Sequence, residues 1–159
     1  MTMEEFLEVE SIKRVRDLYS HYLDAGELRK LVELFTDDAV LDFGPYGSWQ
    51  GKETFYEKFV EAERPFYARG YFTSYHATTN HVVDLTGPDT AVGRSYLVEF
   101  VIEELEKSAN PLYWLGMYDD DYRKVGGTWK IARTALQFTW PKRLVGEAFP
   151  GPFVPRAPD

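Results

Sequence analysis

Apolar residues recur at helical spacing through the first part of the chain. Between Glu8 and Leu23 they lie one turn apart and predict an amphipathic helix with a wide buried stripe, formed by Ile12, Val15, Leu18, Tyr19, Tyr22 and Leu23. Gly26 interrupts this pattern, and a second short helix ending before Thr36-Asp37-Asp38 is predicted from Leu28, Leu31, Val32, Leu34 and Phe35. From Gly51 to about Ala68, one apolar side predicts a third helix, with Phe55, Phe59, Ala62 and Phe66.

The rest of the chain has the pattern of β-strands. A short strand is predicted from Ala39 to Phe43, before the turn Gly44-Pro45-Tyr46-Gly47. After Gly70 we expect four long strands, at Tyr71 to Leu85, Thr90 to Ile102, Leu112 to Lys124 and Thr128 to Trp140. Turn signals separate them: Gly87-Pro88-Asp89, the charged stretch Glu103 to Asn110, and the hairpin pair Gly126-Gly127.

Helices followed by a meander of long strands predict an α+β fold. We expect a curved antiparallel or mixed sheet wrapped around three helices as a cone, with one pocket at its wide end. The 159 residues suffice for one domain. We place that domain at residues 1–142, followed by a proline-rich tail at 143–159. The stretch Pro141 to Asp159 has five prolines and no clear period, so we expect it to wrap a surface or to be mobile.

The aromatic content changes this picture, because 16% of the residues are Phe, Trp or Tyr. Tyr and Trp carry polar tips that need partners when buried. A cavity wall that is apolar and also hydrogen-bonding would use them, as ligand pockets do. A subunit interface is equally rich in aromatic residues. Both interpretations stay open, and both can hold.

Charge and motifs exclude several classes of function. A net charge of −8 argues against nucleic acid and against an anionic membrane surface as partners. The chain has no cysteine, no basic and apolar leader segment and no run long enough to span a membrane. We therefore expect a cytoplasmic protein. No phosphate-binding glycine loop, nucleophile elbow or dinucleotide fingerprint is present, and we expect no cofactor.

His76 is the first candidate for chemistry. It lies early in the first long strand, and strand side chains alternate between faces. Without a bulge, His76 and His81 point to opposite faces, so that only one of them lines a pocket. If that residue is His76, Thr78 and Asn80 share its face. The alternative is a histidine hydrogen-bonded within the sheet or at an interface.

Asp24 at the end of the first helix has two interpretations. With Glu27 it fits a capping box for the second helix. Alternatively its carboxylate accepts a hydrogen bond from His76, which would fix the tautomer and raise the basicity of the imidazole.

Two tyrosines and one acid complete the candidate set. Tyr19 and Tyr22 lie one helical turn apart and can project together as phenol donors, or they can be core residues. Glu99 stands between Val98 and Phe100 on the second long strand, either as a desolvated acid with a raised pKa or in an ion pair at an edge. Asp119-Asp120-Asp121 is interpreted as a solvated turn or bulge, and we expect no metal site.

The chain resembles the SnoaL-like branch of the nuclear-transport-factor-2-like superfamily over about residues 8 to 140. The matching segments are Ile12 to Asp24, Leu34 to Val40, Trp49 to Glu53, His76 to Asn80, Ala91 to Arg94 and Tyr122 to Ile131. Members include scytalone dehydratase, bile acid 7α-dehydratase, hexachlorocyclohexane dehydrochlorinase, polyketide cyclases and non-catalytic binding proteins.

The resemblance implies a histidine–aspartate pair and a helix tyrosine, matched here by His76, Asp24 and Tyr19. Glu99 falls nearest the second-strand acid of the bile acid enzyme, and Phe138 stands where that enzyme has an arginine. Tyr22, Asn80, Glu99, Trp114 and Phe138 are the expected substrate-binding residues.

On these grounds we expect a cofactor-independent lyase or isomerase of the dehydratase type. Its substrate would be a small hydrophobic, oxygenated molecule of polyketide, terpenoid or steroid type. The alternatives are a non-catalytic module that binds a hydrophobic ligand, a polyketide cyclase, or a β subunit that scaffolds an oxygenase. A homodimer or another homo-oligomer is expected, because the outer face of a curved sheet needs covering.

Overall fold

A computed structural model describes residues 1–44, 47–68, 74–102 and 112–140. The expected tail and the charged stretch Glu103 to Asn110 lie outside these residues. Helices α1 (Met3–Asp24) and α2 (Leu28–Val32) come first, and helix α3 (Lys52–Tyr67) follows two short strands. The strands are β1 (Phe35–Asp42), β2 (Ser48–Gln50), β3 (Ser74–Gly87), β4 (Thr90–Val101), β5 (Leu112–Val125) and β6 (Thr128–Trp140).

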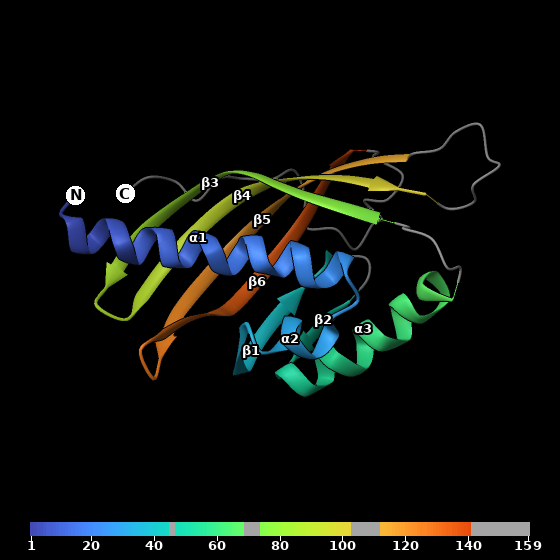
Figure 1. Ribbon diagram of the computed structural model, residues 1–159, viewed down its shortest axis with the longest axis horizontal. Helices are drawn as coiled ribbons and strands as arrows, with labels where there is room; N and C mark the ends of the chain where they lie inside the picture. The colour runs from blue at the N-terminus through green and yellow to red at the C-terminus, as the bar shows by residue number, and fades with distance from the viewer. Residues whose placement is uncertain (45–46, 69–73, 103–111, 141–159) are drawn as a thin grey trace.

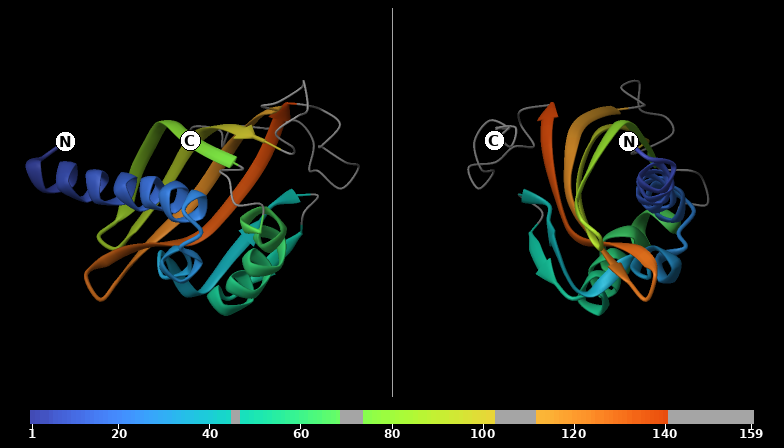
Figure 2. Two further views of the ribbon diagram at one scale, coloured as in Figure 1. Left: turned by 45° about the vertical axis from the view of Figure 1, so that its right-hand side comes forward. Right: turned by 90° about the vertical axis from the view of Figure 1, so that its left-hand side faces the viewer.

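The six described strands form one mixed sheet in the order β2-β1-β6-β5-β4-β3. All neighbouring pairs are antiparallel except β1 and β6, which are parallel. The sheet is strongly curved and open, and its concave face turns toward α1 and α3 (Figures 1 and 2). The α+β expectation is therefore confirmed, with a curved mixed sheet that does not close into a barrel.

Local sequence signals explain where the elements begin and end. Thr2 caps α1 in a capping box, accepting from the Glu5 backbone N–H at 3.1 Å while its own N–H donates to the Glu5 carboxylate at 2.6 Å. Gly26 follows α1 with a φ of +71°, which glycine adopts without strain. Gly126 and Gly127 both have positive φ, as the tight hairpin between β5 and β6 requires.

The start of β1 differs from the expectation. Thr36-Asp37-Asp38 does not close the second helix; it lies within β1, which begins at Phe35. The pairing of β1 with β6 shifts register between Phe35 and Val40, so these polar residues lie at an irregularity of the strand. Their composition is typical of a helix end, and the tertiary pairing overrides it.

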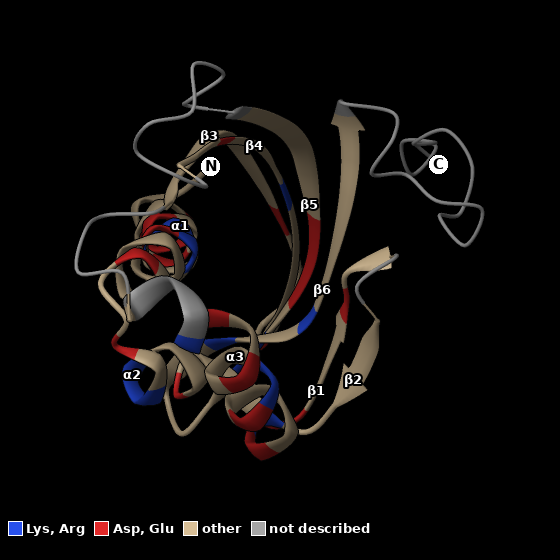
Figure 3. Ribbon diagram, turned by 90° about the vertical axis from the view of Figure 1, so that its right-hand side faces the viewer, with Lys and Arg blue, Asp and Glu red and all other residues tan. Residues whose placement is uncertain are grey.

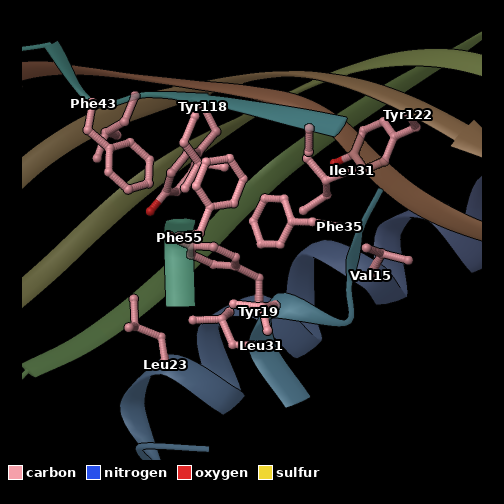
Figure 4. Close-up of a cluster of buried hydrophobic side chains, with 14 of the residues drawn as sticks. Val15, Tyr19, Leu23, Leu31, Phe35, Phe43, Phe55, Tyr118, Tyr122 and Ile131 are labelled. Atoms are coloured by element: carbon pink, nitrogen blue, oxygen red, sulfur yellow. The ribbon is translucent and has the colours of Figure 1, made fainter. Parts of the chain in front are cut away.

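An aromatic chain connects the helices to the sheet. Edge-to-face contacts join Tyr118 of β5 to Tyr19 of α1 (5.9 Å between ring centroids), Tyr19 to Phe35 of β1 (6.0 Å), and Phe35 to Phe55 of α3 (5.5 Å). These four rings are almost completely buried, and Figure 4 shows them clustered between the helices and the sheet. Such contacts add to the burial energy and fix the position of α1 over the concave face.

A buried ion pair lies beside this cluster. The Arg16 side chain donates to both carboxylate oxygens of Asp120, at 2.5 and 3.0 Å, and to Thr134 at 2.7 Å. Asp120 also accepts from the Tyr122 hydroxyl at 2.7 Å. Arg16, Asp120 and Thr134 are completely buried. The acidic run at Asp119-Asp120-Asp121 is therefore not simply a solvated turn, because its central carboxylate holds α1 against the sheet.

Candidate functional site

A cavity of about 250 Å³ opens between α1, α3 and the concave face of the sheet. Its wall is mainly aromatic, formed by Tyr19, Phe43, Trp49, Phe59, Trp114, Tyr118 and Phe138. One histidine and two acids also line it: His76, Glu99 and Glu63. Lys58 is also a lining residue; it pairs with Glu61 at 2.8 Å and is nearly half exposed.

The structure brings His76 and Asp24 into contact. Asp24 is the last residue of α1, and its Oδ1 lies 2.5 Å from Nδ1 of His76 on β3. Its Oδ2 accepts from the His76 backbone N–H at 3.0 Å. Since an ionised carboxylate can only accept, Nδ1 carries the hydrogen and Nε2 is directed to other partners. Both side chains are about 90% buried.

The capping-box interpretation of Asp24 is wrong. The N-cap of α2 is Glu27, which makes no side-chain capping bond. Both carboxylate oxygens of Asp24 bind His76 instead. A short turn separates the two helices. Asp24 therefore lies at the C-terminal end of α1 and not over the first amides of α2.

Glu99 of β4 is the cross-strand neighbour of His76. The two residues are direct partners in the β3–β4 ladder, and Oε1 of Glu99 lies 3.4 Å from Nε2 of His76. Burial raises the pKa of the Glu99 carboxyl above its usual range, although the nearby imidazole acts in the opposite direction. The imidazole therefore stands between two carboxyl groups, one at each ring nitrogen.

These carboxyl groups also change the basicity of His76. Burial by itself opposes protonation of the ring, but the hydrogen bond that the ring donates to Asp24 and the negative charge of Glu99 outweigh it. The result is a raised pKa for His76. A neutral His76 in this site is consequently a stronger base than a histidine in water.

Tyr19 lies in the cavity wall with its ring almost completely buried. Burial raises the pKa of its phenol, so Tyr19 stays protonated and can donate a hydrogen bond. Tyr118 beside it has the same character for the same reason. The guanidinium of Arg16 lies 4.6 Å from the Tyr19 ring and 4.0 Å from the Tyr118 ring, on the side of the core.

Trp114 and Phe138 also line the cavity, in edge-to-face contact at 5.5 Å. Two other expected binding residues do not line it. Tyr22 is turned toward α2, where Lys30 Nζ lies 5.7 Å from its ring. Asn80 is exposed and has a φ of +52°, at an irregularity in β3 between Thr79 and Val82.

The same irregularity corrects the expectation for the two histidines. Because it adds a residue between the paired segments of β3, His81 returns to the concave side, where its Nε2 lies 3.4 Å from the Tyr122 hydroxyl. Burial lowers the pKa of His81. Both histidines therefore face inward, although only His76 is among the residues of this cavity.

Several cavity residues were missed in the sequence. Glu63 of α3 had a usable signal, because it lies one turn beyond Phe59 on the side of the helix that was predicted to be buried. Burial raises the pKa of the Glu63 carboxyl. Tyr118 alternates in phase with Tyr122, which marks the inward face of β5. No comparable signal pointed to Trp49.

Among the described residues, no group of three or more histidines and acids has an arrangement that could hold a metal ion. None of the helices in the described ranges is long and apolar enough to span a bilayer.

Several solved structures have a fold similar to that of this chain. A candidate scytalone dehydratase from Novosphingobium aromaticivorans has 25% identity and a TM-score of 0.72, with 87% of this chain and 89% of that chain covered. An NTF2-like protein with a cystatin-like fold from the same organism has 19% identity and a TM-score of 0.73, covering 86% and 85%. A protein of unknown function from Mycobacterium tuberculosis has 23% identity and a TM-score of 0.70, covering 85% and 73%.

The last two similarities establish the fold alone. No curated protein matches the chain significantly. The model of the SnoaL-like domain matches residues 4–135, which include α1 and nearly all of the sheet. This chain therefore belongs to the SnoaL-like domain family.

Proposed function

We propose that this protein is a cofactor-independent lyase or isomerase of the dehydratase type. The substrate is a small hydrophobic, oxygenated molecule that fills the aromatic cavity. The observation that carries this proposal is the His76 imidazole in the cavity wall, held at Nδ1 by Asp24 at 2.5 Å. The likeness to a candidate scytalone dehydratase supports the same reaction class.

In the proposed reaction His76 removes a proton from a carbon next to a carbonyl group. The proton goes to Nε2, and Asp24 stabilises the imidazolium that forms. The C–H and C–OH bonds break, a C=C bond forms, and the hydroxyl leaves as water after receiving that proton from the His76 imidazolium, which returns the base to its neutral form. Tyr19 donates a hydrogen bond to the oxygen on which negative charge develops.

A binding protein without catalysis would need only the aromatic wall. Such a protein would not need a carboxylate that orients the His76 ring. In a binding protein we would expect Asp24 to cap the amides of α2 instead. Both oxygens of Asp24 instead bind His76, which supports the enzyme over the binding module. A cyclase would use the same base, so the reaction product distinguishes it from a dehydratase.

The test uses β-hydroxy ketones built on one or two rings, because loss of water gives a conjugated enone that absorbs in the ultraviolet. We expect turnover by the wild-type protein, and a rate lower by about 10²- to 10⁴-fold in His76→Ala and in Asp24→Asn. His21→Gln is the matched control, because His21 is an exposed histidine on α1. Undiminished turnover by folded His76→Ala would contradict the mechanism.

We also propose that the protein forms a homodimer through the outer face of β3, β4 and β5. Tyr96, Tyr113 and Leu115 point to this face and are 39–50% exposed. The Phe100 ring packs against Tyr113 at 5.2 Å and extends the apolar patch. Apolar surface of this kind on a sheet is typical of an interface.

A further inference from the structure

The charges around the cavity are unbalanced. Asp24 and Glu99 stand at the two ring nitrogens of His76, at 2.5 and 3.4 Å, so a protonated ring compensates only one of them. Glu63 adds a third carboxyl group from α3. His76, Glu99 and Asp24 all interact electrostatically with Glu63, which places the four groups in one field.

The cations near the cavity do not restore the balance. Lys58 forms an ion pair with Glu61 at 2.8 Å and is nearly half exposed. Arg16 lies behind the Tyr19 and Tyr118 rings and is paired with Asp120. Within the described ranges, no cation forms an ion pair with Glu63.

Glu63 also differs from the other acids of its helix. Glu53 pairs with Arg29, and Glu61 pairs with Lys58, both on the exposed surface of α3. Glu57 is exposed. Only Glu63 of these four lines the cavity. An acid turned into an aromatic cavity is costly to keep charged unless a partner arrives.

The aromatic wall beside these acids suits a cation as well as an apolar body. Trp49, Trp114 and Phe59 present aromatic rings to the cavity, and ring faces attract ammonium groups. The volume limits the size of the ligand. An apolar cavity of about 150 Å³ holds one benzene ring, so about 250 Å³ suits a body of one or two rings.

We propose that the cavity selects a one- or two-ring compound that carries a protonated amine, with the amine directed at Glu63 and Glu99. This deepens the proposed function, on which it rests for the position of the ligand, by giving the charge of the substrate. The ammonium group supplies the charge that Lys58 and Arg16 do not. An anionic compound of the same size is excluded by the carboxyl groups.

Binding of such a ligand would also favour the neutral, basic form of His76. A positive charge beside His76 disfavours its protonated form, and it favours the charged forms of Glu63 and Glu99. Binding of the amine therefore releases protons from the site. A neutral ligand of the same shape has no such effect.

The test compares three probes with one naphthyl body: 1-naphthylmethylamine, 1-naphthylmethanol and 1-naphthoate. Isothermal titration near neutral pH measures their affinity for the full-length protein, and repetition in phosphate and Tris buffers measures proton release. We expect the amine to bind about tenfold more tightly than the alcohol, since hydrogen bonds to charged groups contribute that much. We expect no binding of 1-naphthoate, and proton release with the amine alone.

Glu63→Gln should remove most of the preference for the amine over the alcohol. Glu57→Gln removes the same charge from the exposed side of α3 and should keep the preference. Equal binding of the three probes, binding of none of them, or an unchanged preference in folded Glu63→Gln would overturn the proposal. This test measures affinity and not turnover. If the wild-type protein shows no preference for the amine but His76→Ala still abolishes turnover, the proposed reaction stands. Conversely, if the preference for the amine is found but His76→Ala keeps full turnover, the proposed reaction fails and the proposed ligand charge stands.

Discussion

One carboxylate holds both the backbone and the side chain of the same histidine. Asp24 accepts from the His76 backbone N–H at 3.0 Å through Oδ2 and contacts Nδ1 at 2.5 Å through Oδ1. The first contact ties the end of α1 to β3, and the second fixes the tautomer and the orientation of the ring. Fold and chemistry therefore depend on the same residue.

This pairing predicts how stability depends on pH. The pKa of His76 is raised in the folded protein from an ordinary value of 6.5. The folded state then holds this proton more tightly than the unfolded state, so the stabilisation is complete below about pH 6.5 and is lost as the pH rises through the folded pKa. We expect the difference in unfolding free energy between wild type and His76→Gln to decrease as the pH rises above about 6.5.

Urea denaturation followed by tryptophan fluorescence measures this difference. Glu99 also has a raised pKa and would change stability in the same direction. The comparison is therefore repeated in a Glu99→Gln background, which removes the contribution of Glu99. A difference that is constant or grows with pH would show that Asp24 does not hold the charged ring.

The buried pair of Arg16 and Asp120 predicts strong destabilisation by single substitutions. Removal of one partner leaves a charge with no exposure to water, which typically costs about 3–5 kcal/mol. We expect losses of this size for Arg16→Met and for Asp120→Leu, and we expect the double variant to recover most of the loss. Urea unfolding of the three variants measures the coupling.

Lys13→Ala provides the control for that experiment, because Lys13 belongs to an exposed pair with Glu10 on the same helix. Exposed pairs contribute little, so we expect almost no change. If the double variant is as unstable as the sum of the single variants, the two residues do not act as a pair.

The proposed dimer predicts sensitivity at the outer face of the sheet. A charge at Tyr96, which is half exposed there, would be desolvated in the interface. We expect Tyr96→Glu to be monomeric in sedimentation equilibrium at concentrations where the wild type is dimeric. Val125→Glu is the control, because Val125 is equally exposed at the hairpin end of β5. A monomeric wild-type protein would contradict the proposal.

Most of the fold could be predicted from the sequence, because its signals are local and periodic. The four long strands were expected within three residues of their bounds, and β6 was expected at the same residues, Thr128–Trp140. Strand β2 was not expected, since three residues carry no period. Thr36 to Asp38 was misassigned because pairing with β6 decides the conformation there, and pairing is not visible in a local window.

Less of the candidate site than of the fold could be predicted from the sequence. His76, Asp24, Tyr19, Glu99, Trp114 and Phe138 were all expected in the pocket, partly on the family resemblance. Asn80 was misplaced because one additional residue in β3 changes which side chains face inward. No role was predicted for Arg16, although it lies in the apolar stripe of α1, four residues after Ile12 and three before Tyr19. Its partner, Asp120, is distant in the sequence, and periodicity carries no information on such contacts.

The support that Asp24 gives to the His76 imidazole is measured most directly by NMR of the ring. Proton and nitrogen shifts of His76, assigned with His76→Gln, report its tautomer and its pKa across the pH range. We predict a hydrogen on Nδ1 and a pKa above the ordinary 6.5 in the wild type, and a clear fall of that pKa in Asp24→Asn. A ring that titrates at its ordinary pKa and does not respond to Asp24→Asn would contradict the catalytic pair.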